Sequence, residues 1–152
     1  MKPMKTVAKR TGVALAVVLV AIQLVPVTRT NPAISAEMPA TPELRTVLRR
    51  ACYDCHSNET VWPWYSRVAP VAWLIAHDVN DGRAKLNFSA WDRMAATQQA
   101  KRVRESGRNV QDGDMPPWYY LPMHPAARLS DADKAVLVAW SRTAGGPEPT
   151  KR

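Results

Sequence analysis

The sequence predicts an all-α fold: short helices joined by fixed loops, with one hydrophobic helix at the N-terminus. The chain has 13 prolines among 152 residues, together with six tryptophans and a single phenylalanine. Few stretches alternate in the manner of strands, whereas apolar residues recur at helical spacing between proline and capping signals. About a hundred residues remain beyond the leader, which is enough for one domain with a modest core.

Residues 1–29 are predicted to be an export signal or membrane anchor. A basic head, MKPMKTVAKR, precedes the apolar run TGVALAVVLVAIQLVPV, an order that keeps the positive end in the cytoplasm. Gly12 to Val27 spans 16 residues. This is about 24 Å of helix, short against roughly 30 Å of hydrocarbon. Cleavage after Ser35 is the alternative, but the polar stretch TRTN before it favours an uncleaved anchor.

Residues 30–40 read as a linker, residues 41–146 as the folded domain and residues 147–152 as a tail. The first helix of the domain is expected to begin at Thr41-Pro42, where a capping residue precedes a proline. Its apolar stripe leads into Cys52. The second helix is expected to open at Pro70 and to close at Gly82.

Two more helices are expected in the second half of the chain. Ser89-Ala90-Trp91-Asp92 resembles the start of a capped helix, which we expect to continue to Gly107. Ser130-Asp131-Ala132-Asp133 predicts a last helix, which Gly145-Gly146 ends.

The net charge of +8 does not indicate nucleic-acid binding, because it is unevenly distributed. Residues 1–35 carry five basic side chains and no acidic one, and subtracting those five charges leaves +3 for residues 36–152. The high isoelectric point is therefore largely a property of the leader, and a nucleic-acid partner is not expected.

Both cysteines of the chain fall in CYDCH, residues 52–56. A disulfide is one interpretation for an exported chain, but redox-active pairs usually begin a helix that follows a strand. Here the pair ends a predicted helix. Zinc is a second interpretation, but no second cysteine pair supplies the remaining ligands. The pattern is best explained by one covalent haem c, with thioethers at Cys52 and Cys55 and with His56 as the proximal iron ligand.

Three stretches carry a resemblance to a known family: CYDCHSNETVWPWYSRVAPVAWL, GRAKLNFSAW and GDMPPWYYLPMHPAARLS. They resemble the haem-binding domain family of bacterial membrane-associated c-type cytochromes, from about Gln23 to Trp140. The segment QLVPVTRTNPA also resembles the start of that family, which favours an anchor; Ala33 departs from it, where a proline is expected. The resemblance implies a small cytochrome c-like helical domain on the periplasmic side of the inner membrane, with an electron-carrying role.

A second axial ligand to the iron is expected from a residue far along the chain. Met115 is the strongest candidate, because it lies in GDMPP, where two prolines fix the backbone of the loop. A methionine packed on the core is the alternative interpretation of this residue. Four further candidates are weaker, of which His124 is the most credible histidine: Met94, Met123, His77 and His124.

The remaining features are mostly explained by packing and solvation. Seven aromatic residues are expected to wall the haem and the core: Trp62, Trp64, Tyr65, Trp73, Trp91, Trp118 and Tyr119. A basic cluster is expected to be a solvated helix face, with docking of an acidic redox partner as the alternative: Lys101, Arg102, Arg104 and Arg108.

Taken together, these features predict a membrane-tethered carrier of single electrons that acts on a redox partner protein and is not itself an enzyme. The alternative is a haem-based sensor or a peroxidase-like enzyme with an open or displaceable distal site. The two differ in the sixth iron ligand, since two protein ligands suppress binding of a substrate to the iron.

Overall fold

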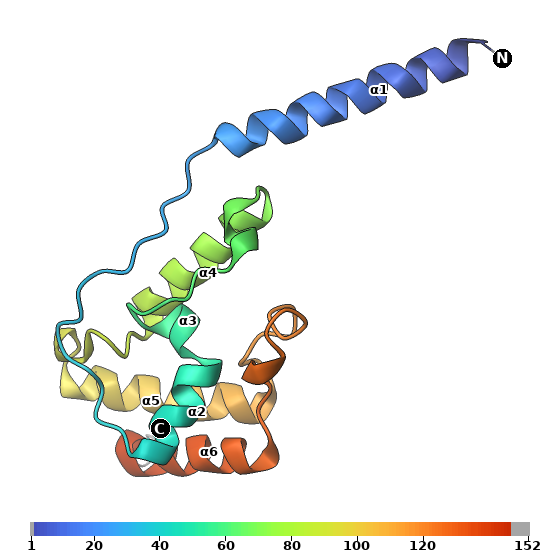
Figure 1. Cartoon of the computed structure of the whole chain (residues 1–152). Helices are drawn as coiled ribbons and strands as arrows, with labels where there is room; N and C mark the ends of the chain where they lie inside the picture. Colours follow the sequence, from blue (N-terminus) through green and yellow to red (C-terminus); the bar gives the residue numbers. More distant parts are fainter. Residues whose placement is uncertain (1, 147–152) are drawn as a thin grey trace, which may run out of the picture. The chain divides into compact units, whose positions relative to one another are not determined.

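The computed structural model describes residues 2–146 and confirms the all-α prediction (Figure 1). Within those residues no strand forms, although Ala36 and Ala90 pair in an isolated parallel β-bridge. The predicted tail, residues 147–152, lies outside the described part of the chain.

Two compact units make up the structure. The first consists of Met1–Thr30 and Trp62–Asp78, and the second consists of Asn31–Val61 and Val79–Arg152. Each unit is thus assembled from segments that are distant in the sequence.

Helix α1 (Lys2–Ala21) continues into a short 3-10 helix, η1 (Ile22–Leu24). Within them, Thr6–Leu24 is a 19-residue stretch that is apolar enough to cross a membrane and is not buried in the protein. At 1.5 Å per residue it is about 28 Å long, close to the thickness of the hydrocarbon layer. The length predicted from Gly12 to Val27 is shorter because that segment begins after the last basic residue of the head, whereas the helix includes Lys9 and Arg10.

The motif CYDCH lies at the junction of two helices. Helix α2 (Pro42–Ala51) begins as predicted, with the Thr41 hydroxyl oxygen accepting a hydrogen bond from the Leu44 amide at 3.3 Å. Its apolar stripe is buried, and Cys52 follows at its C-terminus. The one-turn helix α3 (Tyr53–His56) then carries the rest of the motif.

Helix α4 (Val71–Lys85) runs through Gly82, so the predicted helix end at Gly82 is wrong. A β-carbon added at Gly82 would lie 2.5 Å from the carbonyl oxygen of Cys55. Glycine is therefore present because two backbones approach each other closely here, and not because the helix stops.

Helix α5 (Ala96–Asp112) also differs from the prediction at both ends. The Ser89–Asp92 segment leads into a separate 3-10 helix, η3 (Trp91–Arg93), and α5 begins only after Ala95. Gly107 lies inside α5, which ends at Gly113, a residue in the left-handed conformation with φ of 80°. A left-handed glycine is the usual way to end a helix.

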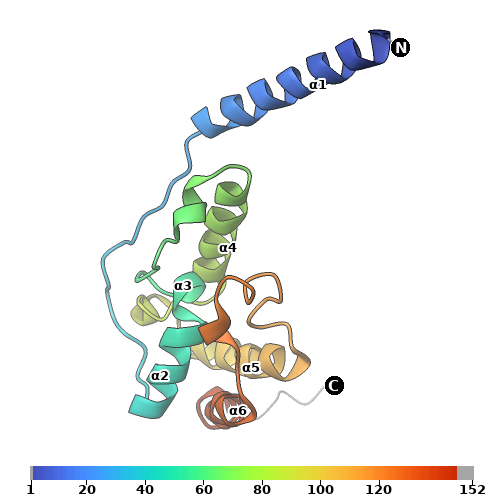
Figure 2. The same cartoon turned by 45° about the vertical axis from the view of Figure 1, so that its right-hand side comes forward.

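Helix α6 (Asp131–Gly145) begins as predicted with a complete capping box. The Ser130 hydroxyl accepts from the Asp133 amide at 3.1 Å, and the Asp133 carboxylate accepts from the Ser130 amide at 2.8 Å. Helices α5 and α6 lie side by side (Figure 1 and Figure 2). Gly107 and Gly145 sit at this contact, where they allow the two helices to approach closely.

The core of the second unit lies between α2, α3, α5, α6 and the segment that follows α4. Its buried members are Met38, Leu44, Val47, Leu48, Tyr53, Leu86, Phe88, Val110 and Leu137. Met38 comes from the segment predicted as a linker, and its amide donates to the Phe88 carbonyl at 2.8 Å. Residues 30–40 therefore contribute to packing in addition to connecting the leader to the domain.

Gly107→Ala is expected to destabilise the second unit by about 1–3 kcal/mol, since the new methyl would overlap the Ser141 side chain. Thermal unfolding would measure the loss. In the double variant Gly107→Ala with Ser141→Gly, the side chain moves from one helix to the other, and we expect most of the stability to return. Equal stability of Gly107→Ala and the wild type would show that the helices do not pack as described.

Candidate functional site

The two cysteines and the histidine of CYDCH are presented by one turn of backbone. The amides of Cys55 and His56 both donate to the Cys52 carbonyl, at 3.2 and 2.9 Å. Cys52 also packs against the core cluster. The structure thus holds the three side chains close together, with Cys52 at the junction between α2 and α3 and with Cys55 and His56 on α3.

Neither Cys52 nor Cys55 is in a disulfide, and both residues are half-buried. Burial raises the pKa of the Cys52 thiol to about 12, and the neighbouring Cys55 contributes to the rise. Catalytic dithiols instead have a lowered pKa, because the thiolate is the reactive form. Among residues 2–146, no group of three or more His, Cys, Asp and Glu side chains is placed to hold a metal ion. The raised pKa of the Cys52 thiol therefore does not favour a redox-active pair.

The His56 ring is oriented by two backbone carbonyls. Its Nδ1 lies 3.0 Å from the Gly82 oxygen and 3.1 Å from the Leu86 oxygen. Because a carbonyl only accepts, Nδ1 must carry the proton, and the lone pair of the neutral ring is then on Nε2. Burial lowers the pKa of the His56 imidazole, against the opposing effect of the two carbonyls, and so favours the neutral ring.

Gly82 makes this orientation of His56 possible. Its missing side chain lets α4 approach the Cys55 carbonyl, and the same residue supplies a carbonyl to the His56 ring. This role of Gly82 differs from that of the helix terminator predicted from the sequence. The signal that pointed to it was its position inside a run that otherwise continues as a helix to Lys85.

A buried polar network supports the residues that follow the motif. Ser57 and Asn58 are almost fully buried, and the Arg83 guanidinium donates to the Ser57 carbonyl at 2.7 Å. The Asn58 amide donates to the Ser89 hydroxyl at 3.0 Å, and the Asn87 side chain donates to that of Asn58 at 2.8 Å. Sequence reasoning missed this network, although the polar run SNET directly after CYDCH was its visible sign.

Met115 lies in the loop that leaves α5. Its amide and that of Asp114 both donate to the Asn109 carbonyl, at 3.1 and 2.9 Å, so the start of the loop is fixed. Further along the loop, the Tyr120 hydroxyl donates to the Asp54 carboxylate at 2.7 Å. Since Asp54 lies between the two cysteines of the motif, this bond ties the loop to α3. The side chain of Met115 is 37% exposed.

The other candidates for a second ligand have different surroundings. Met94 packs against the core cluster, and Met123 is exposed. The His124 ring stacks on Tyr120 with 3.7 Å between centroids, and its Nδ1 lies 3.1 Å from the Tyr120 carbonyl oxygen. His77 is exposed on α4 in the first unit. The assignment of Met115 as ligand stays a prediction.

The aromatic residues are less buried than a core role requires. Trp91 packs against the core cluster, whereas Trp64 and Trp118 are 71% and 80% exposed. Trp73 and Tyr119 are also exposed. Trp91 thus contributes to the core as expected, whereas these four lie at the surface on loops and at a helix start, and their expected role in walling the haem stays a prediction.

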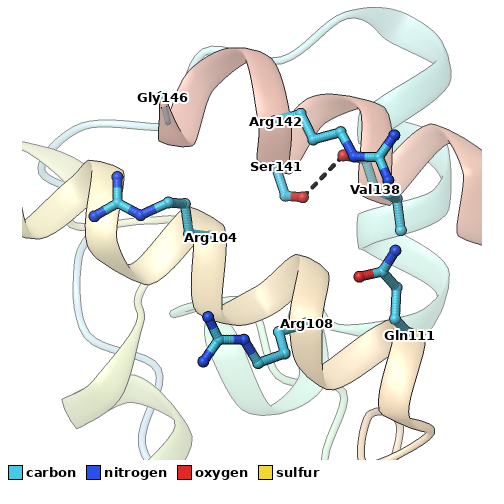
Figure 3. Close-up of a pocket in the computed structure, with 7 residues that line it drawn as sticks. All are labelled: Arg104, Arg108, Gln111, Val138, Ser141, Arg142 and Gly146. Atoms are coloured by element: carbon cyan, nitrogen blue, oxygen red, sulfur yellow. Dashed lines mark hydrogen bonds between the residues drawn. The ribbon is translucent and has the colours of Figure 1, made fainter. Parts of the chain in front are cut away.

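The basic cluster of α5 is largely engaged in local contacts. Lys101 and Arg102 both contact the Glu105 carboxylate, and Arg104 donates to the Gly145 carbonyl. Arg104 and Arg108 line a pocket of about 290 Å³ between α5 and α6, shown in Figure 3. No residue of CYDCH lines this pocket, so it is separate from the candidate site.

The chain is similar to known proteins. The model of the haem-binding domain family matches residues 17–143 of the chain. A relative named cytochrome c peroxidase Ccp, from Escherichia coli (strain K12), is 29% identical over 96 residues, which cover 60% of this chain and 20% of the relative. The chain thus spans about a fifth of the length of that protein. No solved structure matches the chain.

The family match covers most of the chain and includes CYDCH, both ends of α4 and the loop that carries Met115. The chain belongs to the haem-binding domain family.

Proposed function

We propose that the chain is a c-type cytochrome that holds one covalent haem and transfers single electrons on the periplasmic side of the membrane. The observation that carries this proposal is the orientation of the His56 ring: its Nδ1 faces two carbonyls, which assigns the lone pair to Nε2. This is the arrangement that a proximal iron ligand requires.

The residues present fit the haem group. Cys52 and Cys55 would provide the thioether sulfurs, because they lie one turn apart and neither is in a disulfide. His56 would bind the iron through Nε2. The carbonyls of Gly82 and Leu86 fix the tautomer and the orientation of the ring, and they make it a more basic ligand.

Haem iron, when bound, supplies a reversible one-electron change of oxidation state. The protein's part is to keep the ligands still and water away while the charge changes. The hydrogen bonds to His56 and the buried network around Asn58 support the first requirement. Met115 is proposed as the second ligand, on a loop held by Asn109 at its start and by the Tyr120–Asp54 bond beyond it.

The location rests on the leader. The basic head and the apolar stretch Thr6–Leu24 fit an uncleaved anchor with its positive end in the cytoplasm. A domain attached to the far end of such a span lies in the periplasm, where an electron carrier would meet a redox partner protein.

A second candidate function is a peroxidase-like enzyme or sensor, favoured by the name of the E. coli relative. It would use the same haem attachment but would need an iron position that an exogenous ligand can reach. The spectrum of the wild-type protein separates the two functions.

Cys52→Ala and Cys55→Ala are each expected to reduce the yield of holoprotein strongly, because each variant lacks one thioether anchor. Extraction of the purified wild-type protein with acidified acetone should leave the haem on the chain. Haem that leaves completely under these conditions, or a disulfide between the two cysteines, would contradict covalent attachment.

Met115→Ala is expected to abolish the weak far-red band of a methionine-ligated ferric haem and to lower the reduction potential, since a thioether favours ferrous iron. It should also open the iron to carbon monoxide or recruit a histidine. Met123→Ala is the matched control and should leave the spectrum nearly unchanged. A high-spin wild-type protein, or loss of the band in His124→Ala in place of Met115→Ala, would overturn the assignment.

Gly82→Ala is expected to raise the reduction potential, because the new methyl would push the Cys55 backbone away and weaken the hydrogen bond to His56. Stability should fall by about 1–3 kcal/mol, the usual cost of overpacking. Asn80→Ala, at an exposed position of the same helix, is the control. Redox titration with thermal unfolding tests both effects, and an unchanged potential would remove Gly82 from the proposed role.

A further inference from the structure

The first unit exposes a group of apolar side chains near the outer end of the candidate membrane span. Trp64 is 71% exposed and Leu74 is 50% exposed, and Val68 and Val71 are each 43% exposed. All four belong to Trp62–Asp78, which the structure groups with the leader. Residues 62–77 contain no Asp or Glu, and their basic residue Arg67 is exposed.

Gln23 links this segment directly to the span. Its side-chain amide donates to the Ala69 carbonyl at 3.1 Å, and its side-chain oxygen accepts from the Ala69 amide at 2.9 Å. Arg29, six residues further along, donates to the Ser66 carbonyl at 2.9 Å. The backbone of residues 66–69 is therefore held at two points by the chain that emerges from the membrane.

These bonds fix the depth of the segment. Gln23 lies one residue before the end of the apolar stretch Thr6–Leu24, and Ala69 is one hydrogen bond away from it. Each interfacial layer of a bilayer is roughly 5–7 Å thick, from about 30 Å of hydrocarbon within about 40–45 Å in total. Side chains within a few residues of Ala69 are then within reach of that layer.

We propose that Trp64, Val68, Val71 and Leu74 form a lipid-contacting surface that rests in the outer interfacial layer of the bilayer. The inference depends on the proposed uncleaved anchor. Tryptophan is enriched at this depth, because its ring is apolar and its N–H is polar. Residues 62–77 carry no carboxylate that lipid phosphates would repel, and the positive charge of Arg67 attracts those phosphates.

The test uses the full-length holoprotein in phospholipid bilayers, with a nitroxide on Leu74→Cys or Val71→Cys. Ala135→Cys, at an exposed position of α6, is the control. Collision with a water-soluble nickel complex should be several-fold lower at Leu74 than at Ala135, and collision with oxygen, which concentrates in lipid, should be higher. Adding Gln23→Ala should raise nickel access at Leu74, because the link to the span is lost.

Two outcomes would overturn the proposal. Nickel access at Leu74 equal to that at Ala135 means that the surface faces water, and protection from both nickel and oxygen means that haem or a protein covers it. Failures of the underlying proposals look different. Recovery of a soluble chain without its leader would contradict the proposed anchor. Labelling of the wild-type chain with nitroxide would show that its cysteines are not in thioethers.

Discussion

The hydrogen bonds between the His56 ring and the carbonyls of Gly82 and Leu86 are the constraint on which the second unit depends. They require the end of α4 to lie against the motif, and this approach is possible because position 82 has no side chain. The segment that follows α4 also holds the backbone of His56, since the Phe88 amide donates to the His56 carbonyl at 2.8 Å. Phe88 is also buried in the core, where it stacks on Tyr53. The position of His56 is therefore determined by the packing of the unit as a whole.

The polar residues after the motif extend this constraint. Ser57, Asn58 and Ser89 are buried, and each is hydrogen-bonded. Among residues 6–146, no buried side-chain nitrogen or oxygen lacks a hydrogen-bond partner. A fully satisfied network is rigid, because moving one member leaves another unpaired in a medium of low dielectric constant. Rigid surroundings suit a haem whose charge would change during electron transfer. This rigidity is the physical link between the fold and the proposed function.

The sequence predicted those elements whose ends are set by local chemistry. The hydroxyls of Thr41 and Ser130 cap α2 and α6 through contacts within three residues, so their pattern can be read without a fold. Gly82 and Gly107 misled the prediction because a glycine has two uses: it ends helices, and it admits a neighbouring backbone or side chain. Only the tertiary contacts with Cys55 and Ser141 distinguish the second use from the first. The candidate ligands in CYDCH were visible from spacing, whereas the carbonyls that orient His56 belong to residues about 30 positions away.

The two proposed functions share one half of the site and differ in the other. CYDCH and the hydrogen bonds around it are compatible with both an electron carrier and a peroxidase. The loop after α5 would therefore distinguish the two functions. That loop is held at its start by the Asn109 carbonyl and further along by the Tyr120–Asp54 bond. Both ties act on the backbone or on side chains other than that of Met115. Under the proposed ligation by Met115, the hold of this loop on the iron would therefore decide between the two functions.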